Sequence, residues 1–217
     1  ANITRATART NSKNKGSKWG QYDFASWCAV WLLYLVEFAD WNSQSVIGIG
    51  ICGSSSMANT GGTDSMNYHT GTAASSRTTA GAVQYRNIEN PWGNIWEWID
   101  GVNFSDGTVY VCTTPANYAD DTTSGYTNAG TKTQSDGWIK AIGISSTAPW
   151  AFFPTEVGGS ETTYIPDYAY CNSGWRVLNV GGNYGHTTGY VGLFYFNANY
   201  TSSYSSSGVG ARLLFHP

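Results

Sequence analysis

The sequence predicts an α+β fold of short antiparallel strands with one or two helices. One segment, residues 22–41, carries apolar side chains at spacings of three and four, the period of a helix with one buried face. Near the C-terminal end, residues 175–182, 192–196 and 210–215 are short apolar segments separated by Gly, Ser, Thr and Asn, a pattern typical of strands joined by loops. With 217 residues and 15% aromatic content, the chain is large and apolar enough to build a core from these elements.

The helix predicted over residues 22–41 has Asp23 near its start, where a carboxylate suits the positive end of the helix dipole. We interpret its apolar stripe as core packing rather than a cofactor site. The stripe comprises Phe24, Trp27, Cys28, Trp31, Leu32, Leu35 and Phe38.

The middle of the chain predicts strands separated by loops. Residues 46–53 indicate a short buried strand, and residues 53–79, rich in Gly, Ser, Thr and Asn, indicate a long loop. Further strands are expected at 108–114 and 137–144, with a polar insertion between them, and residues 148–153 are apolar and flanked by proline.

The first 20 residues differ in composition from the rest. They are polar and carry five cations, so we expect 1–20 to be an extended arm that packs on the domain or joins it to an upstream module. Residues 21–217 are then the folded domain.

Composition excludes several function classes. The formal net charge is −3 and the 11 cations are dispersed, so no nucleic-acid surface is expected. No apolar run approaches the ~20 residues that span a bilayer, so no membrane insertion is expected. The four cysteines form no CxxC pair and the three histidines are isolated, which predicts free thiols and no metal site.

The most distinctive segment is residues 91–101, PWGNIWEWIDG. It resembles the GN-x-WEW signature of the formylglycine-generating-enzyme branch of the C-type lectin fold. Residues 176–184, RVLNVGGNY, resemble that branch's R-V-x-R-G-G-S-W strand, and residues 210–213, GARL, resemble its closing G-F-R strand. The order and spacing match over about residues 85–215, so the resemblance implies a C-type lectin fold for 21–217.

The residues of this signature have a simple physical interpretation. Trp96 and Trp98 alternate and therefore share one face of an extended segment. Gly93 and Gly101 permit tight turns around them.

Glu97, between the two tryptophans, invites a catalytic interpretation. We interpret it instead as a buried structural carboxylate that caps backbone N–H groups or pairs with Arg176 or Arg212. Both arginines fall in strand motifs and are expected to be scaffold residues with satisfied partners.

The resemblance also bears on enzymatic activity. Enzymes of this branch that oxidise a substrate cysteine use paired cysteines and copper near the C-terminus, whereas no cysteine follows Cys171 here. Their iron-dependent, sulfoxide-forming relatives need a cluster of histidine and carboxylate side chains that this sequence does not suggest. We therefore predict no catalytic residue, no cofactor and no enzymatic activity. Residues 168–217 contain no Asp or Glu, so no calcium site of the classical lectin kind is expected.

The C-terminal region resembles the variable proteins of diversity-generating retroelements, especially those of gut phages. The similar segments are 174–184, 192–200, 202–208 and 210–215, together with the helical region 34–48. In that family a fixed lectin-fold scaffold displays a surface rewritten by adenine-directed mutagenesis of AAY codons. The resemblance implies a variable region at about 168–212.

The genetic code offers a test of this idea. An AAY codon with variable adenines cannot yield Lys, Glu, Gln, Met or Trp, and none of these five types occurs from Asn183 to Gly208. Tyr, by contrast, is concentrated from Tyr164 to Tyr204, where it offers a large and rigid contact surface.

We predict that the ligand-binding positions are the polar and tyrosine positions of this region. They are Tyr184, Gly185, His186, Thr188, Tyr190, Asn197, Tyr200, Tyr204 and Ser206, with Ala169, Cys171 and Asn179 as secondary candidates. His186 has no acidic neighbour in sequence and is not expected to act as a base.

The predicted function is ligand or receptor binding. The partner would be a variable protein or glycan on a bacterial surface, and the chain would be exposed on a phage virion or a bacterial cell. The alternatives are a formylglycine-generating-type oxidoreductase and a structural virion protein without a ligand. The sequence leaves the ligand and the oligomeric state open.

Overall fold

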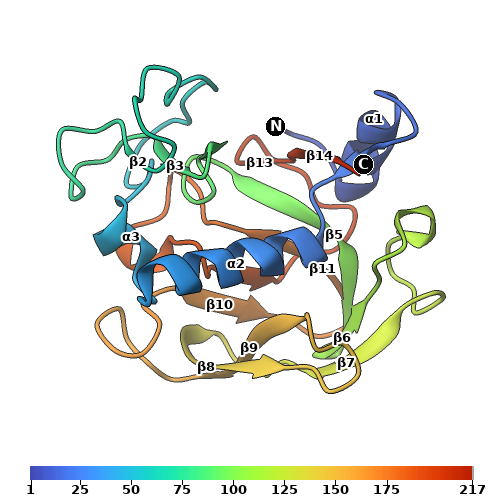
Figure 1. Cartoon of the computed structure of the whole chain (residues 1–217). Coiled ribbons are helices and arrows are strands. Elements are labelled where there is room, and N and C mark those ends of the chain that lie inside the picture. The colour runs from blue at the N-terminus through green and yellow to red at the C-terminus, as the bar shows by residue number, and fades with distance from the viewer. Residues whose placement is uncertain (217) are drawn as a thin grey trace.

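A computed structural model describes residues 1–216 and has a mixed α+β architecture that is mostly sheet, as the sequence predicts (Figure 1). The described residues form three α-helices, one more than expected: α1 (Arg5–Lys13), α2 (Phe24–Phe38) and α3 (Ser43–Val46). Two short 3₁₀ turns, η1 (Pro115–Asn117) and η2 (Thr188–Tyr190), lie in loops. No helix within residues 1–216 is long and apolar enough to cross a membrane.

The strands are short, and most belong to one sheet. They are β1 (Trp19–Gln21), β2 (Gly71–Thr72), β3 (Val83–Tyr85), β4 (Ile88–Glu89), β5 (Trp96–Ser105), β6 (Thr108–Val111), β7 (Thr127–Thr131), β8 (Gly137–Ile144), β9 (Phe152–Val157), β10 (Tyr168–Cys171), β11 (Trp175–Val180), β12 (Phe196–Ala198), β13 (Val209–Gly210) and β14 (Leu213–Phe215). The main sheet runs β7-β6-β5-β11-β12-β10-β8-β9 and is nearly closed, with β13 added in parallel beside β5. The β10–β12 pair is also parallel, whereas the other neighbours along this path are antiparallel.

Helix α2 confirms the predicted amphipathic helix and covers one face of the main sheet (Figure 1). Leu32 was wrongly placed in its buried stripe, because this side chain lies at the margin of the stripe and is 45% exposed. Asp23 caps it by accepting a hydrogen bond from the Ser26 backbone N–H at 2.9 Å. Trp27 and Trp31 are almost fully buried, and Trp27 contacts Phe196 of β12 across the core. Burial of these rings is the main apolar contribution that fixes the helix to the sheet.

The N-terminal segment is not the extended arm that we expected, because residues 5–13 form α1. The Thr4 side chain caps this helix by accepting from the Thr7 backbone N–H. Arg5 has no exposed surface, so α1 is an integral part of the folded chain. The prediction treated the cations of 1–20 as solvated, but two of them, Arg5 and Arg9, pair with carboxylates of the folded domain.

Residues 46–53 do not form the predicted buried strand. Gly48 and Gly50 have φ of 155° and 78°, which interrupts extended pairing. The loop expected over 53–79 is present, with the short β2 near its end.

Residues 192–196 were expected to be a strand, but only Phe196 belongs to one. The backbone N–H groups of Leu193 and Phe194 donate to side-chain oxygens of Ser43 and Asp167 instead of to a neighbouring strand. Side-chain acceptors from distant segments thus replace the backbone hydrogen bonds of a strand pair. A local sequence pattern contains no information about such distant acceptors.

Three other strand predictions are confirmed, that for 137–144 in full and the other two in part. The segments 108–114, 137–144 and 175–182 contain β6, β8 and β11, and the polar insertion between the first two contains β7. Residues 148–153 include only the start of β9, and residues 210–215 divide between β13 and β14, the latter pairing with β1.

Candidate functional site

The face of the main sheet opposite α2 carries a second, smaller aromatic cluster. Trp96 and Trp98 of β5 lie on it together, as their alternation predicts, with Val177, Tyr195 and Val209. The intervening positions of the sheet, including Ile99 and Leu178, belong to the core beneath α2. The sheet therefore separates a helix-covered core from this second cluster.

Half-buried rings lie over that cluster. We call the combined surface the aromatic face and define it as Trp138, Tyr168, Tyr170, His186, Tyr190, Tyr200 and Tyr204 above the buried Trp96, Trp98 and Tyr195. These rings come from β5, β8, β10 and the loops on either side of β12.

Strand register explains why rings from distant segments meet. Trp98 pairs with Asn179 across β5 and β11, Asn179 with Asn197 across β11 and β12, and Asn197 with Tyr170 across β12 and β10. Residues opposite one another in neighbouring strands share a face, so these four side chains form one row across the sheet. On β8, Trp138 pairs with Tyr168 and extends the surface by another strand.

The outer rings contact one another continuously on the β8–β10 side. Trp138, Tyr168 and Tyr190 form a triangle with centroid separations of 5.0, 5.4 and 4.7 Å, and the Trp138 indole N–H donates to the Gly189 carbonyl at 2.8 Å. Tyr170 lies 4.6 Å from Tyr168. These distances are typical of stabilising aromatic pairs.

His186 joins this group to the rest of the face. Its ring lies 5.2 Å from Trp96, 5.5 Å from Tyr195 and 6.0 Å from Tyr190. Burial lowers the pKa of His186, so the ring is neutral at pH 7. Its Nδ1 atom is buried and has no hydrogen-bond partner within residues 1–216.

Two tyrosines of the face, Tyr170 and Tyr200, are also uncharged at neutral pH. Burial raises the pKa of Tyr170 to about 12, and burial together with Tyr204 raises that of Tyr200 to about 12. The hydroxyl of the buried Tyr195 accepts hydrogen bonds from Trp96 and Asn197. The face therefore offers rings and neutral polar groups to a ligand.

The structure brings together only some of the predicted binding residues. His186, Tyr190, Tyr200 and Tyr204 belong to the aromatic face. Gly185 and Thr188 are exposed in the loop that carries His186 and Tyr190, and Tyr184 and Ser206 are half-buried in adjoining loops.

The prediction that Asn197 lies on the binding surface is wrong, because this residue is only 2% exposed. Its side chain donates to Tyr195 beneath the outer rings. The secondary candidates Ala169, Cys171 and Asn179 are buried for the same reason: they lie within strands that the outer rings or the core cover. Both polar atoms of the Asn179 side chain lack a partner within residues 1–216.

Sequence reasoning missed Trp138, Tyr168 and Tyr170. The last two alternate in the segment Tyr168-Ala169-Tyr170, and period-two spacing is the signal that could have placed both on one face. Trp138 carried no such signal because its position depends on the pairing of β8 with β10.

The carboxylate of the distinctive motif is confirmed as half of an ion pair. Both Glu97 oxygens accept from the Arg212 guanidinium, which also donates to the Glu89 carbonyl at 2.6 Å. Arg176 is less satisfied than expected, because it donates to the Trp175 carbonyl while its buried Nε has no partner within residues 1–216.

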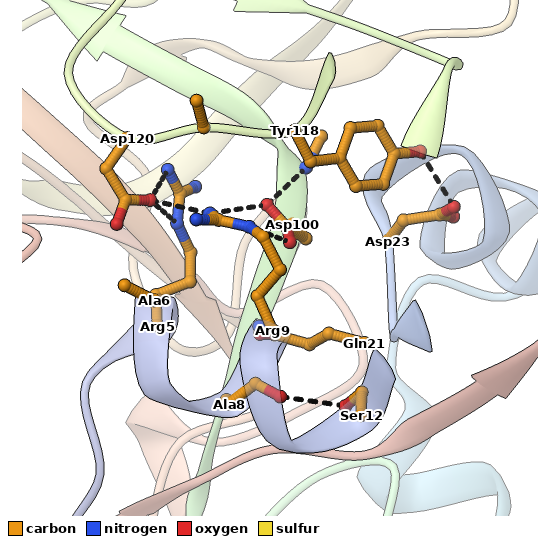
Figure 2. A network of polar contacts seen from close by, with 12 residues as sticks. Arg5, Ala6, Ala8, Arg9, Ser12, Gln21, Asp23, Asp100, Tyr118 and Asp120 are labelled. Carbon is orange, nitrogen blue, oxygen red and sulfur yellow. Dashed lines mark hydrogen bonds and ion pairs between the residues drawn. The ribbon is translucent and has the colours of Figure 1, made fainter. Parts of the chain in front are cut away.

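A separate polar network fixes α1 to β5 (Figure 2). Arg5 donates to Asp120 at 2.7 Å, and Arg9 donates to Asp100 at 2.6 Å and to Asp120 at 2.7 Å. Burial by itself would raise the pKa of Asp120, but the positive charges of Arg5 and Arg9 lower it overall. Asp120 therefore remains ionised within the network. Tyr118 donates to Asp23 beside it at 2.9 Å. Since these charges are paired, we interpret the network as structural.

The described residues also include four cysteines and contain apolar cavities away from the aromatic face. The four cysteines are buried free thiols, and burial raises the pKa of Cys28 to about 12. Within residues 1–216, no three His, Cys, Asp or Glu side chains gather as a metal ion would require. An apolar cavity of about 430 Å³ lies beside α2, and one of about 340 Å³ lies beneath α1.

A scan against protein-family models finds no match, and a search of curated proteins finds no related sequence.

Proposed function

We propose that the chain is a ligand-binding protein whose aromatic face, with the loops beside it, is the recognition surface. The observation that carries the proposal is a set of seven half-buried rings drawn from β8, β10 and two loops. The stacked pair Tyr200 and Tyr204 joins the other five through the buried Trp96, which contacts both His186 and Tyr200. Such rings supply rigid, amphipathic contact area at a low entropic cost. Tyr and Trp are also the residue types most enriched at binding hot spots.

We further propose that this surface is carried by a C-type lectin scaffold of the formylglycine-generating-enzyme-like branch and is diversified as in retroelement variable proteins. Four predicted variable residues support this, because His186, Tyr190, Tyr200 and Tyr204 converge on the aromatic face although they come from separate loops. The Trp96–Trp98 pair of the signature motif forms the buried base on which these rings rest.

In this proposal the protein attaches a phage virion, or a bacterial surface, to a variable protein or glycan ligand. A single surface of this kind gives modest affinity, so display in several copies would strengthen attachment. The buried charges serve the scaffold: Glu97 pairs with Arg212, and the arginines of α1 pair with Asp100 and Asp120.

The test of diversification is to sequence the same locus from several related genomes. We expect substitutions to concentrate at Tyr168 and Tyr170 and in the loops over 183–190 and 199–207, with Trp96, Trp98, Trp138 and Arg212 unchanged. Substitutions spread evenly along the chain would contradict the proposal.

A further inference from the structure

Exposed carboxylates lie at the edge of the aromatic face. Asp121 accepts a hydrogen bond at 2.5 Å from Ser202, which lies in the loop between Tyr200 and Tyr204. On the opposite side, Asp136 accepts at 2.9 Å from the Cys171 backbone N–H, at the end of β10.

Glu161 supplies a third carboxylate, beside Gly189 and Tyr190. A Cβ atom on Gly189 would lie only 2.2 Å from the Glu161 Oε2 atom, so the carboxylate lies directly against this loop. We call Asp121, Asp136 and Glu161 the acidic rim. All three side chains are exposed.

No cation within residues 1–216 forms an ion pair with this rim, although the buried Lys132 lies near enough to Asp136 to interact with its charge. Every ion pair among the described residues involves other carboxylates. The two cation–π contacts of the same residues involve Phe215 and Tyr85, which lie outside the aromatic face. The faces of the outer rings are therefore free of cations, and their negative quadrupoles add to the charge of the rim.

The shape of the surface indicates a macromolecular ligand. The rings extend from Trp138 on β8 to the loop that carries Tyr204. None of them lines the cavities of about 430, 340 and 510 Å³, which lie beside α2, beneath α1 and between residues 51–62 and 73–82. An extended surface suits a protein segment, since small molecules favour enclosed pockets.

We propose that the aromatic face binds a protein segment with exposed Lys or Arg side chains, whose cations lie over the tyrosine rings and between the rim carboxylates. This inference rests on the proposed function, and charge complementarity supports it. Aromatic rings that contact no cation attract one to their faces. Carboxylates without an ion-pair partner strengthen the binding of a basic ligand and increase its association rate.

The experiment uses two soluble peptides with the same Gly-Ser-Lys repeat, one with free lysines and one with every lysine acetylated. Each is titrated into the ¹⁵N-labelled protein at low salt while backbone amide shifts are followed. We expect the lysine peptide to shift amides in 168–171, 186–190 and 200–204 and to bind at least about fivefold more tightly than the acetylated one.

A variant pair separates the rim from overall charge. The rim variant is Asp121→Asn with Asp136→Asn and Glu161→Gln. The matched control is Glu37→Gln with Asp64→Asn and Glu156→Gln, which removes three exposed charges away from the rim. We expect the rim variant to bind the lysine peptide about fivefold more weakly and the control to change its affinity by less than about twofold.

Equal weakening by both variants, equal binding of both peptides, or shifts outside the aromatic face would each overturn the inference. These results would leave the proposed function standing, because the locus comparison tests it without reference to the ligand's charge.

Discussion

The rings of Tyr200 and Tyr204 stack with centroids 3.8 Å apart and planes 15° from parallel. The turn between them places both residues on one side, with the Tyr204 backbone N–H donating to Thr201 at 3.1 Å. Trp96 lies 5.7 Å from the first ring and Trp98 lies 6.3 Å from the second. The pair is thus held in place before any ligand arrives, which reduces the entropic cost of binding.

The stacking of this pair can be measured directly. The double-mutant cycle of Tyr200→Ala and Tyr204→Ala should give a coupling of about 0.5–1.5 kcal/mol in the free energy of unfolding, the usual range for aromatic pairs. Urea denaturation of the four proteins provides the values. A Tyr204→Phe variant should retain most of the coupling, since it keeps the ring. A coupling near zero would show that the stack makes no contribution to stability.

The N-terminal helix should be essential for stability because its buried Arg5 binds four acceptors. These are the side chains of Asp120 and Asn103 and the carbonyls of Ile99 and Val102. Replacement by Met leaves the Asn103 side chain and two buried carbonyls without their donor, and leaves Asp120 with Arg9 alone. It should lower the free energy of unfolding by about 3–5 kcal/mol.

The matched control for Arg5 is Lys13→Ala, an exposed cation on the same helix, for which the change should stay within about 0.5 kcal/mol. Guanidinium denaturation monitored by tryptophan fluorescence compares the two. Similar small losses in both variants would mean that α1 is not anchored through Arg5.

Asp167 should make stability depend on pH. Burial raises its pKa well above the ordinary value, and its Oδ1 atom has no partner within residues 1–216. The folded state therefore favours the protonated acid. Stability from this group is present below its unfolded pKa of about 3.9 and is lost as pH rises through the folded pKa.

Asp167→Asn removes this titration while retaining an acceptor for the Phe194 backbone N–H. The variant should gain stability relative to the natural protein as pH rises above about 4, by about 1.4 kcal/mol for each pH unit between the unfolded and the folded pKa. Urea denaturation across this pH range measures the difference. A difference that stays constant with pH would contradict the assignment.

Gly93 in the signature motif should tolerate no side chain. Its φ is 74°, and an added Cβ would lie 2.8 Å from the Ile51 backbone nitrogen. Gly158 has a φ of 127° but open space around the same position. Gly158→Ala should therefore cost only the conformational penalty, about 1 kcal/mol, while Gly93→Ala should cost at least about 2 kcal/mol more. Thermal denaturation ranks the two, and equal losses would be inconsistent with the close approach.

The sequence predicted the parts of the molecule that depend on local periodicity. The helix period of 22–41 placed Trp27 and Trp31 in the core, and the alternation of Trp96 and Trp98 placed both on one face. Glu97 was correctly paired with Arg212 as one of two options, because buried charges require a partner.

What the sequence could not predict depends on contacts between distant segments. Asn197 looks like a loop residue, but pairing of β12 with β10 and β11 places it under the outer rings. Trp138 joins the aromatic face only because β8 pairs with β10. Residues 5–13 resembled a solvated basic arm because their carboxylate partners follow more than 90 residues later.

Attachment to bacterial cells tests the central claim most directly. Fluorescent particles that display many copies of the chain are mixed with a panel of strains, and bound particles are counted on each strain that the natural sequence labels. Two double variants are compared. The face variant combines Tyr170→Ala and Tyr204→Ala on the aromatic face, and the control combines Tyr68→Ala and Tyr164→Ala, two tyrosines that are each 63% exposed and lie outside that face. The face variant should reduce attachment at least about tenfold and the control should leave it unchanged; equal attachment by both variants would contradict the account.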